Sequence, residues 1–226
     1  MLRASDYARD IKSIIEAKGW TDILVVGHSM GARTALALGH LLWNDSDTSL
    51  KDKIRHIVCV DISLKGAWGG GMGKPLANFL ENLPYEFADR KSLREYLFAT
   101  CPDPSIAQYL SAVAINASPA DTPERWIFPF NHEAVIGTIH QANAIEDHAS
   151  AAQKESLAEW TMEMVNAGVP VTFLRGESSK VWLKADFDEQ RVEFQHRLLE
   201  FQEWEKCGHG LPFEQRARFV EFLKEL

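Results

Sequence analysis

Short apolar runs alternate with amphipathic stretches along the chain, and the first of them predict a strand, a helix and a second strand. Apolar residues at helical spacing predict a helix over residues 5–18, with Gly19 just past its end. Four consecutive apolar residues, 23–26, predict a strand buried on both faces. An alanine- and leucine-rich stretch, 32–43, predicts the next helix, and the run 54–62 predicts a second strand. This order and spacing indicate a βαβ unit with parallel strands.

The pattern changes between residues 63 and about 167. Glycines and Pro75 mark its beginning, and helical patches over 76–83, 92–99 and 104–114 are separated by further prolines. Helix-forming residues dominate 149–165 and should lead back to the strands. We therefore expect a helical lid, residues 65–167, inserted after the second strand into a core made of residues 1–64 and 168–226.

The last part of the chain returns to alternating strands and helices. Apolar residues predict a strand at 169–174, a helix at 187–197, a weaker strand at 198–204 and a closing helix that begins near Phe213. Strands that alternate with helices are typical of an α/β fold with a mostly parallel sheet. The predicted fold class is therefore α/β.

Composition and charge narrow the classes of partner. The 226 residues are 46% hydrophobic and 25% charged, with a formal net charge of −8 and no basic stripe, which argues against nucleic acid and anionic membrane surfaces. No apolar run approaches the ~18 residues of a membrane span, and charged residues near the N-terminus argue against a signal peptide, so a cytoplasmic location is expected. Three widely spaced cysteines indicate neither a disulfide framework nor a zinc site. We expect no metal or organic cofactor.

The turn between the first strand and its following helix carries the strongest chemical signal. Gly27 and Gly31 bracket Ser29 at two residues on either side, which is the spacing of a nucleophile elbow. Both glycines are expected where the backbone approaches too closely for a Cβ. Such a turn lifts the serine hydroxyl clear of the sheet, and the backbone N–H of Met30 becomes an oxyanion donor.

A serine hydroxyl is a poor nucleophile until an imidazole accepts its proton. The imidazole in turn needs a carboxylate that fixes its tautomer and stabilises its charged form. His209 lies between two glycines after the last predicted strand and is the best candidate for the base, whereas His28 lies inside the turn and is expected to point elsewhere. Two carboxylates are candidates for the acid that orients this histidine. Asp61 ends the strand next to that of the nucleophile, and Glu177 follows the strand at 169–174.

Three segments together resemble the α/β-hydrolase superfamily: Gly-His-Ser-Met-Gly at 27–31, Val-Asp-Ile-Ser at 60–63, and Trp-Ile-Phe-Pro-Phe-Asn at 126–131. More narrowly, the chain resembles small-lid carboxylesterases of the YbfF type and their mitochondrial abhydrolase relatives. The resemblance implies that Asp61 is the acid and that Ser179 lies near the triad. We favour Asp61 over Glu177, while both remain candidates.

The chain departs from this family at its N-terminus. Family members begin with further strands and a His-Gly-type loop that supplies a second oxyanion donor, whereas this sequence begins with the helix before the elbow. We expect the first half of the sheet to be absent and the strand at 23–26 to form an exposed edge. An exposed apolar edge favours pairing with another chain, so a homodimer through this edge is expected.

The predicted activity is hydrolysis of carboxylic esters or thioesters through an acyl-enzyme on Ser29. A serine at this position argues against epoxide hydrolases and haloalkane dehalogenases, which use an aspartate. The alternative is an incomplete or impaired hydrolase that binds a ligand or a partner chain. Aromatic residues in and near the predicted lid suggest an apolar acyl pocket, with the alternative that they form the small core of the lid, as aromatic residues in a lid more often do: Trp68, Trp126, Phe128 and Phe130.

Overall fold

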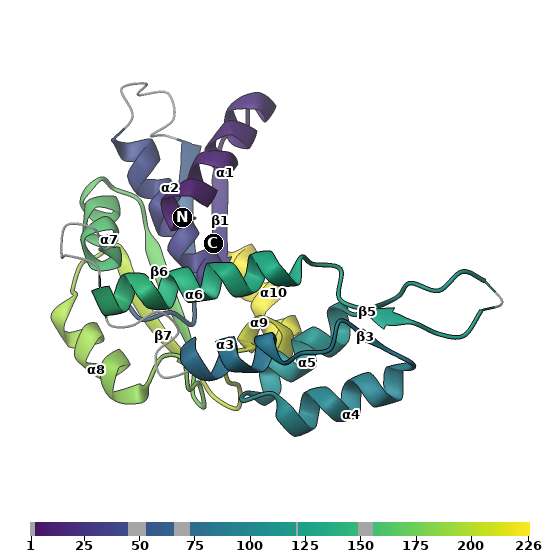
Figure 1. Cartoon of the computed structure of the whole chain (residues 1–226). Coiled ribbons are helices and arrows are strands. Elements are labelled where there is room, and N and C mark those ends of the chain that lie inside the picture. The colour runs from purple at the N-terminus through teal and green to yellow at the C-terminus, as the bar shows by residue number, and fades with distance from the viewer. Residues whose placement is uncertain (1–2, 45–52, 66–72, 121, 149–155) are drawn as a thin grey trace. The chain divides into compact units, whose positions relative to one another are not determined.

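The computed structural model describes residues 3–44, 53–65, 73–120, 122–148 and 156–226. The chain divides into two compact units, one formed by Met1–Gly70 with Ala149–Leu226 and the other by Gly71–His148. Figure 1 traces the elements of both units.

The first unit is built on a four-stranded parallel sheet. The strand order is β1-β2-β6-β7. The first two strands are parallel, which confirms the βαβ unit predicted from the sequence. His28 is in register with Val60, so the first two strands end together, as parallel neighbours must for their following loops to meet. The strands are β1 (Ile23–His28), β2 (Ile54–Val60), β6 (Val171–Gly176) and β7 (Leu199–Trp204).

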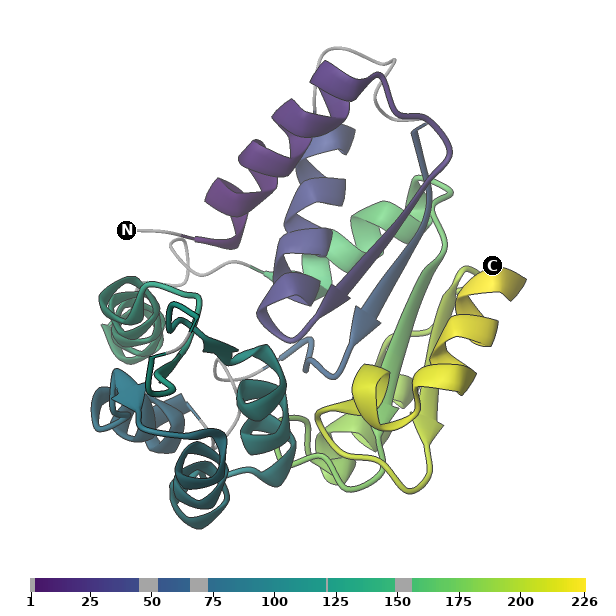
Figure 2. The same ribbon diagram turned by 90° about the vertical axis from the view of Figure 1, so that its right-hand side faces the viewer.

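Helices cover both faces of this sheet, as Figure 2 shows. On one face lie α1 (Ala4–Lys18), α2 (Met30–Trp43), α7 (Leu157–Asn166) and α8 (Lys184–Glu193), whose apolar side chains form one core with Ile57 and Phe173. On the other face, α9 (Leu211–Glu214) and α10 (Arg216–Glu225) pack against Val58, Leu174 and Trp204. The apolar positions of each strand therefore alternate between two cores.

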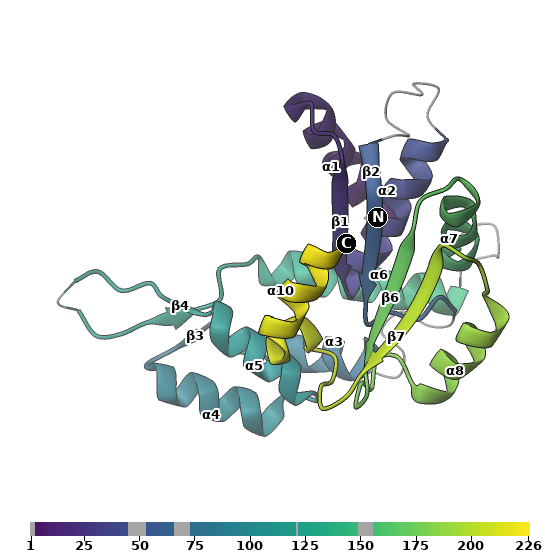
Figure 3. The ribbon, with the colours of Figure 1, turned by 180° about the vertical axis from the view of Figure 1, so that it is seen from behind.

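The strand β1 differs from the sequence-based expectation of burial on both faces. It lies at one end of the sheet and pairs, among the described residues, only with β2 (Figure 3). Val26, in the middle of this strand, is 41% exposed. An edge strand has a neighbour on one side only, so its side chains lose the cover that a second neighbour would provide.

The second unit is mostly helical. Its helices are α3 (Gly73–Glu81), α4 (Arg90–Thr100), α5 (Pro104–Val113) and α6 (His132–His148). The side chains of Asp89 and Asp103 accept backbone N–H groups at the starts of α4 and α5, which caps those helices. A small antiparallel sheet, β3 (Glu86–Phe87), β5 (Trp126–Ile127) and β4 (Ile115–Asn116), and the helix α6 were not predicted from sequence.

The helix α7 belongs to the first unit and packs against α2, where Met164 reaches Gly39. The sequence-based lid extends to residue 167 and so includes α7, whose side chains Met164 and Val165 belong to the core on one face of the sheet. In the ranges that the structure describes, no helix combines the length and apolar character that crossing a bilayer requires.

Candidate active site

The turn after β1 has the backbone of a nucleophile elbow. Ser29 has φ 53° and ψ −119°, a region that residues with a Cβ rarely occupy. Its N–H donates to the carbonyl oxygen of Val60 at 2.9 Å, and α2 begins at the next residue. Strain of this kind persists only where the surrounding structure holds it, and it is typical of a serine raised at the end of a sheet.

The two glycines of the turn have different roles. A Cβ on Gly27 would overlap the backbone of Gly31 and of Ala32, so this position excludes a side chain. A Cβ on Gly31 would meet no atom within 4 Å. The expectation that a Cβ is excluded at both glycines is therefore correct for Gly27 and wrong for Gly31. The start of α2 contacts the backbone of Gly27, whereas the space beside Gly31 is open.

Asp61 and His209 are joined by a hydrogen bond. The Nδ1 atom of His209 lies 2.7 Å from Oδ2 of Asp61, which is fully buried, and the histidine is 7% exposed. Asp61 follows β2 with a φ of 53°, and its own N–H donates to the carbonyl oxygen of Leu174 at 2.7 Å. Since a carboxylate only accepts, Nδ1 carries the proton, and Nε2 is left as an acceptor in the neutral ring.

Two further donors hold the carboxylate of Asp61. The N–H of Gly176 reaches Oδ1 at 3.2 Å, and the hydroxyl of Ser179, a buried side chain, donates to Oδ2 at 2.5 Å. A Cβ on Gly176 would overlap the backbone of Gly208, so the glycine lets the loop after β6 approach the loop that carries the histidine. The carboxylate is thus oriented by three donors from two segments, the end of β6 with the loop after it and the histidine loop.

Glu177 has a different partner. Its side chain is exposed, and Oε2 accepts the N–H of Lys206 at 2.9 Å. The carboxylate therefore ties the loop after β6 to the turn before the histidine loop. Of the two candidate carboxylates, the structure brings Asp61 to the imidazole.

His28 lies against His209, contrary to the expectation that it points elsewhere. Its Nε2 donates to the carbonyl oxygen of His209 at 2.7 Å, and the two ring centroids are 4.7 Å apart. Burial, and then the neighbouring charge of His209, lower the pKa of His28 from 6.5 to about 4. The sequence shows that His28 precedes Ser29, the predicted nucleophile, but it does not show the direction in which the histidine side chain points.

The N-terminus of α2 is the candidate oxyanion site. Met30 is the first residue of this helix, and the first N–H groups of a helix have no acceptor inside it. The partial positive charge at a helix N-terminus favours an anion there.

The predicted pocket residues that the structure describes lie in the second unit. Phe128 is buried and stacks on Phe130, with ring centroids 5.4 Å apart, and on His132 at 5.9 Å. The guanidinium of Arg90 lies 5.3 Å from the ring centroid of Trp126. Trp68 lies outside the described residues.

The cysteines and the possible metal ligands can be compared within the described residues. Burial raises the pKa of Cys207 to about 11 and also raises the pKa values of Cys59 and Cys101, so these thiols stay protonated at neutral pH. Within the described ranges, no group of three or more histidine, cysteine, aspartate or glutamate side chains is arranged to hold a metal ion.

Comparison with solved structures shows the fold. A marine microorganism esterase superimposes with a TM-score of 0.67 at 17% identity, covering 100% of this chain and 77% of that one. An E-2-(acetamidomethylene)succinate hydrolase gives a TM-score of 0.66 at 20% identity, covering 99% and 73%. The thioesterase domain from the curacin biosynthetic pathway gives 0.60 at 18% identity, covering 98% and 73%.

No curated protein matches the sequence. The model of the alpha/beta hydrolase family, in contrast, matches residues 2–222, which is nearly the whole chain. The parallel sheet, the strained serine between a strand and a helix, and the buried carboxylate beside the imidazole agree with that match. The chain therefore belongs to the alpha/beta hydrolase family.

Proposed function

We propose that this chain is a serine hydrolase that cleaves carboxylic esters or thioesters through an acyl-enzyme on Ser29. The observation that carries the proposal is the buried hydrogen bond between His209 and Asp61, in the same unit as the strained Ser29. A carboxylate on Nδ1 stabilises the imidazolium that forms when Nε2 takes a proton.

The proposed reaction has two halves. In the first, Ser29 Oγ attacks the carbonyl carbon while His209 Nε2 accepts the hydroxyl proton, and the oxyanion binds the N–H of Met30. The C–O or C–S bond then breaks, and the leaving alcohol or thiol takes the proton from His209. In the second half, water attacks the acyl carbon by the same route, which releases the acid and restores Ser29.

An esterase and a thioesterase domain are among the solved structures similar to this chain, and this similarity supports ester and thioester substrates. We further propose that the unit Gly71–His148 is the lid and that Trp126 and Phe130, which are partly exposed, can bind an acyl chain, whereas Phe128 belongs to the core of the lid itself. The partner class is a small-molecule ester or thioester.

A fluorophosphonate probe tests the nucleophile without knowledge of the substrate. The probe should label the wild-type chain and leave Ser29→Ala unlabelled. Ser13→Ala, which removes an exposed hydroxyl on α1, is the matched control and should label as the wild type does. A folded wild-type chain that is not labelled, or equal labelling of Ser29→Ala, would contradict the proposal. The first of these outcomes would favour a non-catalytic protein that binds a ligand or a partner.

A further inference from the structure

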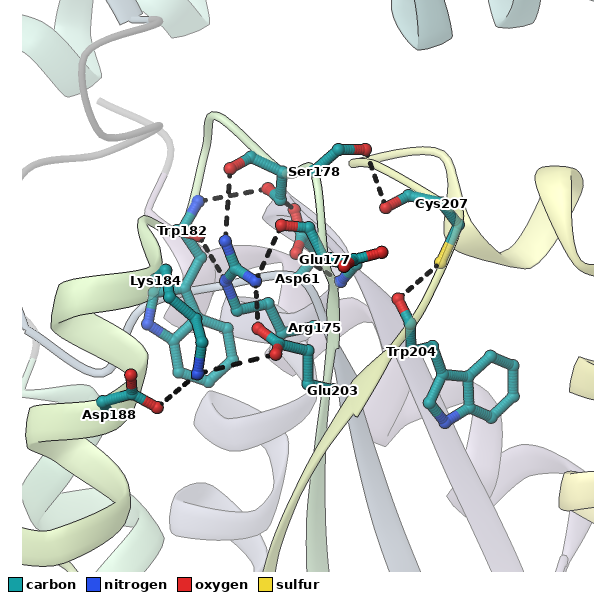
Figure 4. A network of polar contacts seen from close by, with 12 residues as sticks. Asp61, Arg175, Glu177, Ser178, Trp182, Lys184, Asp188, Glu203, Trp204 and Cys207 are labelled. Carbon is teal, nitrogen blue, oxygen red and sulfur yellow. Dashed lines mark hydrogen bonds and ion pairs between the residues drawn. The ribbon is translucent and has the colours of Figure 1, made fainter.

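A buried arginine, Arg175, immediately precedes Gly176, whose N–H binds the Asp61 carboxylate, but lies outside the proposed catalytic set. Arg175 is 2% exposed, at the end of β6, and forms an ion pair with Glu203, its register neighbour on β7. Taking a guanidinium out of water is costly unless its donors are satisfied. Figure 4 shows that the Arg175 side chain is surrounded by hydrogen-bond acceptors.

Three of these acceptors come from one short segment, residues 177–182. The Nε of Arg175 donates to the carbonyl oxygen of Trp182 at 2.7 Å, and Nη1 donates to that of Glu177 at 3.1 Å. A longer contact, 3.5 Å, joins Nη2 to the carbonyl oxygen of Ser179. The rigid fork of one guanidinium therefore sets the path of the loop after β6.

The loop in turn fixes the direction of the Ser179 hydroxyl. Its Oγ accepts the N–H groups of Val181 at 3.1 Å and Trp182 at 3.3 Å. A serine hydroxyl has two acceptor positions and one proton. Because both acceptor positions are occupied, the proton is directed to Asp61 Oδ2, at 2.5 Å.

We propose that Arg175 is a positioning residue for catalysis, acting on the imidazole of His209 through Ser179 and Asp61. Its guanidinium holds residues 177–182 so that the Ser179 hydroxyl and the Gly176 N–H orient the carboxylate. The inference rests on the proposed function for its effect on rate. The geometry that it concerns can be measured without any substrate.

A double-mutant cycle tests whether Arg175 acts through Ser179. Arg175→Lys keeps the charge beside Glu203 but cannot donate to the same set of carbonyl oxygens. Loss of a partner that orients a metal-bound histidine typically costs about 10–100-fold in activity. By analogy, we expect Arg175→Lys and Ser179→Ala each to lower kcat by about 10–100-fold, with KM little changed. The double variant should be no slower than the slower single variant. Losses that multiply would overturn the proposal.

The low-field proton resonance of the His209 Nδ1–H bound to Asp61 is a second readout that loss of stability alone would not move. This resonance should shift or disappear in Arg175→Lys. Val165→Ala, which removes buried volume from α7, is the control that should unfold more easily while keeping both the resonance and kcat. An unchanged resonance and kcat in a less stable Arg175→Lys protein would show a structural role only and overturn the proposal.

A paired replacement, Arg175→Met with Glu203→Leu, covers the case in which Arg175→Lys does not fold. Replacing both members of this partly buried ion pair with apolar residues leaves neither Arg175 nor Glu203 as an unpaired charge, and Lys184, which also contacts Glu203, keeps its ion pair with Asp188. We expect the same loss of kcat and the same change in the resonance. If the wild-type chain hydrolyses no ester but the resonance responds as described, the positioning of His209 stands and the proposed function fails.

Discussion

The side chain of His28 donates a hydrogen bond from Nε2 to the backbone carbonyl oxygen of His209, with 2.7 Å between the two atoms. The rings of these histidines lie against each other, with centroids 4.7 Å apart. The residue before the proposed nucleophile is thus attached to the residue proposed as its base. Only a ring with its proton on Nε2 can make this bond to a carbonyl oxygen.

The first prediction concerns the stability of this contact at low pH. Burial lowers the pKa of His28 to about 4 in the folded chain, whereas an unfolded histidine has a pKa of 6.5. Between these two values the unfolded state binds the extra proton, so stability is complete above pH 6.5 and falls as the pH drops towards 4. The shift corresponds to about 3 kcal/mol at most.

Denaturant unfolding of the wild type and of His28→Gln, at neutral pH and near pH 4, would measure this effect. The glutamine side chain has no proton to gain in that range, so the variant should lose less stability on acidification than the wild type does. Groups that do not contact His28 are the same in both proteins, so their contributions cancel in the difference. Equal losses would show that His28 does not control this part of the pH dependence.

The second prediction compares the two carboxylates. Asp61→Asn leaves His209 without its carboxylate partner and should lower kcat by about 10⁴-fold, the loss caused by the corresponding substitution in a serine protease. Glu177→Gln should change kcat little, because Glu177 accepts the N–H of Lys206 and not the imidazole. Steady-state hydrolysis of a chromogenic ester gives both values. The opposite ranking would transfer the role of the acid to Glu177.

The third prediction separates the two glycines of the turn. Gly27→Ala places a methyl group against the backbone of Gly31. The substitution should lower the free energy of unfolding by at least the ~1–3 kcal/mol of an overpacked core, and it should abolish labelling by the fluorophosphonate probe. Gly31→Ala meets open space inside a helix and should leave labelling intact, with a gain of up to about 1 kcal/mol from helix propensity. Thermal unfolding and probe labelling of both variants would measure this contrast, and equal behaviour would contradict it.

The fourth prediction is that the 226-residue chain associates through the edge of β1. Val26 is 41% exposed on that strand, and a lysine on an edge strand opposes pairing with another strand. Sedimentation velocity should show dimers or larger species for the wild type and a shift to monomer for Val26→Lys. Val220→Lys, at a site on α10 that is 42% exposed, is the matched control and should associate as the wild type does. A wild type that stays monomeric at all concentrations would contradict this prediction.

Local patterns in the sequence predict most elements of the first unit. The helix at 5–18, the strands at 54–62 and 198–204 and the helix after the elbow are confirmed with small shifts at their ends. In the second unit, α6 and the small sheet of β3, β4 and β5 were missed. Strands of two residues are too short for a periodic pattern to form, so their pairing depends on contacts between distant segments.

The same division applies to the candidate site. The spacing of Gly27, Ser29 and Gly31 predicts the elbow, because a tight turn between a strand and a helix is a local feature. Which carboxylate reaches His209 is not local, since Asp61 and Glu177 both follow strands of one sheet. Tertiary structure alone decided that Asp61 contacts the imidazole and that Arg175 organises the loop beside it. The contact between Asp61 and His209 joins residues far apart along the chain, and the contacts of Arg175 depend on the path of the loop after β6. The packing of the sheet sets the geometry of both.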